Sequence, residues 1–85
     1  MDTNQALEQQ LAAEVREAAR SAGVSRNQLA ELTGIPFVTL TRRLASTGKG
    51  FTVAELVAVA AALDLSLVEL ALRAERSLTR PPAAA

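Results

Sequence analysis

The chain of 85 residues is short enough to form one small domain, and 49% of its residues are hydrophobic. It contains no Cys, His, Trp or Tyr, which excludes disulfides, thiolate chemistry and His or Cys metal sites, so we expect neither enzymatic activity nor a cofactor. The formal net charge is zero, which argues against a protein that binds polyanions over its whole surface.

The first element predicted is a helix near the amino terminus, with a cap offered by residues 2–4. Its apolar residues recur at helical spacing on one face, at Leu7, Leu11, Val15, Ala18 and Ala22. Gly23 should end this helix as a carboxy-terminal cap. The amino terminus is polar and shows no apolar leader segment, so we expect a cytoplasmic protein.

A second, short helix is predicted to begin at Ser25 and to end at Gly34, with Leu29 and Ala30 facing inward. The chain then restarts in a third helix over residues 36–45. Its first position suits a proline, because the missing N–H has no partner to lose there. Two tight helices joined by a glycine-containing turn are typical of a helix-turn-helix.

The loop "STGKG" at residues 46–50 precedes two further helices, and each opens on a capping-box pattern, "TVAE" at 52–55 and "SLVE" at 66–69. Asp64 fills the turn between them, and the last helix should run to about Ser77. The apolar run over residues 53–72 could span a bilayer in length, but three acidic residues interrupt it, so two packed helices explain it better and no membrane partner is expected.

The fifth helix, wound at 100° per residue, gathers its core residues on one side, at Leu67, Leu70, Ala71, Ala74 and Leu78. Val68 and Leu72 lie about 100° away and form an apolar edge, which predicts a homodimer interface unless the core wraps further around the helix. The ending "TRPPAAA" predicts a disordered tail over residues 79–85.

Charge is distributed unevenly along the chain. Residues 1–22 carry four acidic side chains against two arginines, whereas residues 23–50 carry four basic side chains against one glutamate. The basic residues of this middle segment are Arg26, Arg42, Arg43 and Lys49. A neutral protein with such a patch can still bind a phosphate backbone there.

The segments "SRNQLAELTGIPFVTLTRRL" and "TVAELVAVAAALDLSLVEL" together resemble the phage repressor and Cro superfamily, also called the Xre family. The matching features are Leu29-Ala30, Gly34-Ile35, Leu40, Glu55-Leu56, Ala60, Leu63 and the stretch from Ser66 to Leu70. The resemblance covers residues 7–72. It implies an all-α, five-helix, repressor-like helix-turn-helix DNA-binding domain over residues 1–78, with the motif at about 25–45.

The resemblance further implies a regulator that binds double-stranded operator DNA as a homodimer, with no small-molecule substrate. In a recognition helix inserted in the major groove, the side opposite Leu40 and Leu44 would meet the bases. The expected base contacts are Phe37, Val38, Thr41 and Arg42, through thymine methyls, a hydroxyl and a bidentate guanine pair. The expected phosphate contacts are Arg26, Asn27, Thr39, Arg43 and Lys49.

The chain departs from the usual family pattern at Arg26, Pro36, Phe37 and Asp64, so base preference does not carry over unchanged. Each expected contact also has a plainer explanation: Phe37 as a core or protein-contact residue, the arginines and Lys49 as solvated charges. Two other functions therefore stay open. One is the DNA-binding antitoxin of a toxin-antitoxin pair, and the other is a helical protein-interaction module.

Overall fold

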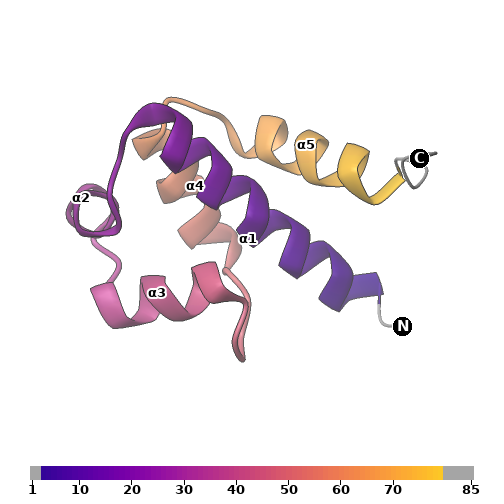
Figure 1. Cartoon of the computed structure of the whole chain (residues 1–85), viewed down its shortest axis with the longest axis horizontal. Coiled ribbons are helices and arrows are strands. Elements are labelled where there is room, and N and C mark those ends of the chain that lie inside the picture. Colours follow the sequence, from indigo (N-terminus) through magenta and orange to yellow (C-terminus); the bar gives the residue numbers. More distant parts are fainter. Residues whose placement is uncertain (1–2, 80–85) are drawn as a thin grey trace.

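The computed structural model describes residues 3–79, and these residues fold into five helices without strands (Figure 1). The helices are α1 (Thr3–Ala22), α2 (Arg26–Thr33), α3 (Phe37–Ala45), α4 (Val53–Ala62) and α5 (Leu67–Thr79). The all-α, five-helix expectation is confirmed. Two boundaries differ from the expected ones. Pro36 occupies the N-cap position just before α3 and is not its first helical residue, and α5 continues beyond Ser77 to Thr79.

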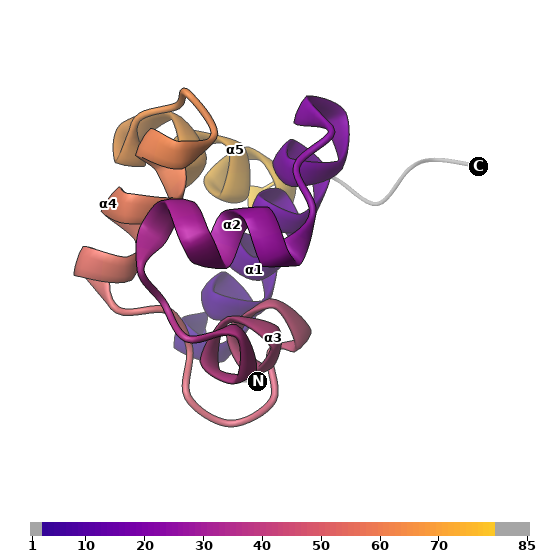
Figure 2. The same ribbon diagram turned by 90° about the vertical axis from the view of Figure 1, so that its left-hand side faces the viewer.

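The long helix α1 is the element against which the others are arranged. It packs along α5, which runs in the opposite direction, and on its other side it contacts α3 (Figures 1 and 2). The shorter helix α2 bridges α3 and α4. All of these helices contribute to one apolar core, formed by Val15, Ala18, Leu29, Ile35, Leu40, Leu44, Leu56, Val59, Ala60, Leu63 and Leu70.

The buried faces of α1 and α5 differ from the expected ones. Ala12 is fully buried in α1, whereas Leu7 and Ala22 near its two ends are exposed. On α5 the buried residues are Leu70 and Ala74, while Ala71 and Leu78 are exposed. Helices α1 and α5 contact one another, and the small side chains of Ala12 and Ala74, which are almost fully buried, allow helices to approach closely.

Helix ends follow the sequence closely. Gly23 and Gly34 adopt left-handed backbone with φ of 71° and 76°, and Asp64 does so at 60°. The capping box at residues 52–55 is complete, and a second complete box joins Ser25 to Gln28, which the sequence reading missed. The box expected at residues 66–69 is only half formed: the Glu69 N–H donates to the Ser66 hydroxyl, but the Glu69 carboxylate pairs with Arg73.

The apolar run over residues 53–72 is divided between α4 and α5 by the turn at Asp64. Within residues 3–79, no helix has both the length and the apolar character needed to cross a membrane. The expected tail over residues 79–85 is wrong at Thr79, which belongs to α5, and residues 80–85 lie outside the described residues, as does Asp2 of the expected amino-terminal cap.

Candidate nucleic-acid interface

Helix α3 is fixed by one buried side and presents the other to solvent. Leu40 and Leu44 are buried, as expected, and Ile35 in the preceding turn is buried with them. This leaves Phe37 43% exposed, Val38 62% exposed and Arg42 also exposed. Large apolar side chains beside an exposed arginine form a surface with both apolar and charged recognition groups.

Arg26, the first residue of α2, lies against the start of α3. Its guanidinium carbon is 5.7 Å from the centre of the Phe37 ring, within the range of a cation–π contact. Asn27, next to Arg26, is exposed. The contact joins the two helices at the edge of the exposed surface and keeps a positive charge there.

Thr39 and Thr41 are set back from this surface. Both are half-buried, and the Thr41 hydroxyl oxygen is buried without a hydrogen-bond partner among the described residues. In this side-chain conformation Thr41 presents no hydroxyl to an incoming base, which differs from its expected role.

Arg43 differs more sharply from its expected role as a phosphate contact. Its Nε donates to the Glu55 carboxylate at 3.1 Å and its Nη1 donates to the Lys49 carbonyl at 3.1 Å. The Arg43 and Glu55 side chains are only 16% and 19% exposed. The guanidinium therefore connects α3 to the following loop and to α4, and these two bonds hold it in a position where the side chain is largely buried.

The Glu55 carboxylate serves two structural partners. It accepts a hydrogen bond from the Thr52 N–H at 2.9 Å, which completes the α4 capping box, and it accepts the Arg43 bond as well. Burial alone would raise the pKa of Glu55, but the hydrogen bonds from Thr52 and Arg43 lower it below the ordinary value of 4.5.

The loop after α3 is held at both of its ends. The Ser46 and Thr47 N–H groups donate to the Arg43 and Arg42 carbonyls at 3.2 Å each, so these two carbonyls in the last turn of α3 are satisfied. Gly50 lies against α1, where an added Cβ would come within 2.5 Å of the Glu8 carboxylate oxygen. Lys49 between them is exposed.

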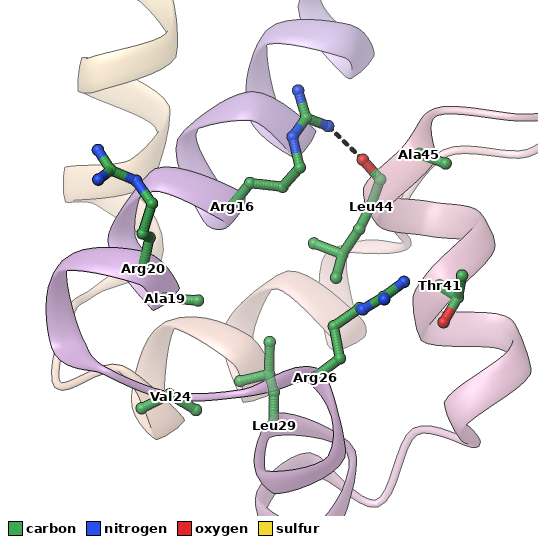
Figure 3. Close-up of a pocket in the computed structure, with 9 residues that line it drawn as sticks. All are labelled: Arg16, Ala19, Arg20, Val24, Arg26, Leu29, Thr41, Leu44 and Ala45. Atoms are coloured by element: carbon green, nitrogen blue, oxygen red, sulfur yellow. Dashed lines mark hydrogen bonds between the residues drawn. The ribbon is translucent and has the colours of Figure 1, made fainter.

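A pocket of about 550 Å³ opens between α1, the start of α2 and one side of α3 (Figure 3). Its rim carries Arg16 and Arg20 from α1 and Arg26 from α2. Its apolar and hydroxyl lining is made by Ala19, Val24, Leu29, Thr41, Leu44 and Ala45. Arg16 donates a hydrogen bond to the Leu44 carbonyl near the end of α3, whereas Arg20 points away from α3 and pairs with Glu17 at 2.6 Å.

The apolar edge expected on α5 is present. Val68 is 66% and Leu72 is 43% exposed, so the core does not wrap around to cover them. Helix α5 lies on the far side of α1 from α3 in both views (Figures 1 and 2). A second set of exposed apolar side chains, Leu32, Val53 and Val57, lies on α2 and α4.

The family model described as "Helix-turn-helix" matches residues 13–70, which is more than half of the chain. The chain belongs to this helix-turn-helix family. Helices α2 and α3 are then the two helices of the motif, and the match agrees with the Xre-like and Cro-like resemblance of the sequence. No curated protein and no solved structure matches the chain.

The helix-turn-helix family is one of DNA-binding regulators, and in such proteins the second helix of the motif enters the major groove. The sequence reading located this helix and its exposed side but missed Arg16. Its position one residue after Val15 showed only that it lies at the border of the buried face of α1. This border faces α3 because of the way α1 crosses the motif, and the periodicity of the sequence gives no information about that crossing.

Proposed function

We propose that this helix-turn-helix protein is a sequence-specific transcriptional repressor that binds a duplex operator as a homodimer through the exposed side of α3. The observation that carries the proposal is the exposed Phe37, Val38 and Arg42 on one short helix beside Arg26. Repression would be steric, by occupation of an operator that overlaps a promoter in the bacterial or phage chromosome.

Base contacts would come from this exposed side. Arg42 has the fork geometry to pair bidentately with O6 and N7 of guanine, and Phe37 and Val38 have apolar surfaces suited to thymine methyl groups. Thr41 would contribute only after its side chain turns, because its hydroxyl is buried in the free protein. Base specificity would therefore rest chiefly on Arg42 and Phe37.

Backbone contacts would come from groups around α3. Arg26 and Asn27 at the start of α2, and Lys49 in the loop after α3, are exposed and available to phosphate oxygens. Thr39 is half-buried and offers a hydroxyl at most. Arg43 is assigned to holding the loop and α4, since its side chain is only 16% exposed and its charge is already paired with Glu55.

Selection of randomised duplex DNA tests the proposed reading surface. The enriched sites should be two-fold symmetric, with half-sites about 34 Å apart along the helix axis. Arg42→Ala should cost about 1–3 kcal/mol on the selected site and relax preference at one base pair per half-site. Arg76→Ala, which removes an exposed arginine from α5, is the matched control and should leave the preference unchanged.

Phe37 has its own discriminating measurement. Phe37→Ala should weaken binding to the selected site, and the loss should shrink when the contacted thymine is replaced by uracil, which lacks the methyl group. If neither Phe37→Ala nor Arg42→Ala alters the enriched sequences, the exposed side of α3 does not read DNA. The protein-interaction module would then become the leading function.

The homodimer is proposed to form through Val68 and Leu72. Leu72→Glu should shift sedimentation toward the monomer while the helical circular dichroism signal is kept. Val57→Glu is the matched control, since Val57 is 49% exposed against 43% for Leu72 but lies on α4. A dimer that survives Leu72→Glu and dissociates in Val57→Glu would move the interface to α4. A wild type that stays monomeric and binds a second, different protein through Val68 and Leu72 would favour the antitoxin alternative.

A further inference from the structure

The pocket between α1 and α3 combines positive charge with an unused hydroxyl. Arg16 and Arg26 stand on two sides of it, and the guanidinium of Arg26 extends toward α3 (Figure 3). The Thr41 hydroxyl is the polar group in its lining that is buried without a partner among the described residues. A buried hydroxyl without a partner is uncommon in folded proteins, and it could donate to a group bound in the pocket only after the Thr41 side chain turns.

The pocket lies on the flank of α3 next to the exposed side. Its lining residues Thr41 and Ala45 are four residues apart, as are the exposed Val38 and Arg42. At 100° per residue, these two rows are about 60° apart around the helix. The pocket therefore faces sideways when Val38 and Arg42 face a base edge.

The dimensions of the DNA major groove determine which part of the DNA would lie beside this flank of α3. The major groove is about 12 Å wide, and a helix with its side chains is about 10–12 Å in diameter, so an inserted helix has a sugar-phosphate backbone along each side. The backbone on the α1 side would run past the pocket mouth. An apolar floor with arginines on the rim suits a deoxyribose and its charged phosphodiester.

We propose that this pocket is a phosphodiester site, in which Arg16 and Arg26 hold one phosphate of the DNA backbone beside α3. The proposal rests on the proposed DNA binding and adds α1 to the interface. Arg16 fits this role while keeping its bond to the Leu44 carbonyl, because a guanidinium has five N–H donors and that bond uses one of them. Arg16 would then link the position of the phosphate to the end of α3.

The decisive measurement is the salt dependence of binding to a selected duplex and to an unrelated duplex, by fluorescence anisotropy between 50 and 200 mM salt. Each neutralised phosphate contributes about −0.9 to the slope of log K against log salt. Because the two arginines hold the phosphate together, Arg16→Ala and Arg26→Ala should each lose that phosphate from both protomers of the dimer and reduce the slope by about 1.8 on both duplexes. Over this salt range the mutant should lose about 12-fold less affinity than the wild type. Arg76→Ala is the control with the same change of charge, and its slope should match that of the wild type.

A second arm identifies the phosphate. Neutral methylphosphonate is placed at single backbone positions flanking the half-site, and at one position it should weaken the wild type but not Arg16→Ala. Arg16→Lys keeps the charge without the fork, so it should restore most of the slope. Circular dichroism of each variant reports whether the loss of the Leu44 contact has disturbed folding.

Three outcomes overturn the inference. Affinity that falls equally at every salt concentration in Arg16→Ala, with an unchanged slope, would make Arg16 a positioning residue of α3. If Arg16→Lys had the same salt slope as Arg16→Ala, the charge of Arg16 would not account for the change in slope. Saturable binding of inorganic phosphate to the free protein, abolished by Arg16→Ala while the duplex slope is unchanged, would make the pocket a small-anion site. Failure of the wild type to bind any duplex would instead refute the proposed function itself.

Discussion

Replacing Arg43 with Ala separates two roles that the same arginine could have. If Arg43 holds the structure together, the variant should lose stability and keep the salt dependence of DNA binding. A hydrogen bond to a charged group contributes about 1.5–3 kcal/mol, and Arg43 also bonds the Lys49 carbonyl. After truncation Glu55 keeps its hydrogen bond from the Thr52 N–H, so the lower end of this range applies. We expect a loss of about 1.5 kcal/mol, or roughly 6–12 °C in Tm for a domain of this size.

The assay is thermal unfolding at pH 7, followed by circular dichroism, with Arg73→Ala as the control. The Arg73–Glu69 pair is shorter, at 2.6 Å, but its side chains are 39% and 48% exposed. Because solvent screens exposed pairs, Arg73→Ala should cost no more than about 0.5 kcal/mol. The loss of stability in the two variants should therefore follow the burial of each ion pair and not the distance between its charged atoms.

A double-mutant cycle with Glu55→Gln isolates the ion pair, because glutamine can keep the capping box while removing the charge. An Arg43→Ala variant no less stable than Arg73→Ala would refute the structural role. If that variant also had a salt slope reduced by about 1.8, the effect of one phosphate per protomer of the dimer, Arg43 would be a phosphate ligand that leaves Glu55 in the complex.

The stability of the protein should depend on the ionisation of Glu55, because the folded state lowers the pKa of this carboxyl. The contribution of Glu55 to stability is present above the unfolded pKa of 4.5 and is lost as pH falls through the folded pKa. Tm measured from pH 7 to pH 3 should fall less in Glu55→Gln than in Glu17→Gln, where an exposed carboxylate is removed; equal profiles would contradict this. Asp64 has a φ of 60° at the carboxyl end of α4, where both left-handed backbone and negative charge are unfavourable. Asp64→Gly should raise stability by about 0.5–1 kcal/mol in urea titrations, and Gly34→Ala, at a φ of 76° with open space around its Cβ, should lower it by about 1 kcal/mol. A destabilised Asp64→Gly would show that the aspartate side chain contributes to the turn.

The fold could be predicted from the sequence because its signals are local. Gly23, Gly34 and Asp64 mark turns through backbone conformation, and Thr52 with Glu55 marks a helix start, all within a few residues. The inward positions of Leu40 and Leu44 followed from helical periodicity alone. Such features do not depend on how the helices are arranged in space, so they can be predicted from a single sequence.

The candidate site was less predictable because its side chains depend on contacts between distant segments. Arg43 is drawn from the expected phosphate contacts by Glu55, twelve residues later, and Arg16 reaches Leu44 across 28 residues. Arg42 and Arg43 are adjacent in sequence but differ in their surroundings, because Arg42 faces solvent and Arg43 faces α4. Counting basic residues in a segment therefore overestimates how many of them are exposed.

The same contacts limit how strongly salt can affect DNA binding by this protein. Helix α3 is held at its start by the Arg26–Phe37 contact and at its end by Arg16 and Arg43, so several cations also orient the helix. With Arg42 proposed to contact a base and Arg43 bonded to Glu55, the cations left for phosphates are Arg16 and Arg26, which share one phosphate, and Lys49. At about −0.9 for each of two phosphates per protomer, a dimer should show a salt slope of about −3.6 on its operator. A slope near −8 would require additional cations, beginning with Arg43, to leave their partners and join the interface.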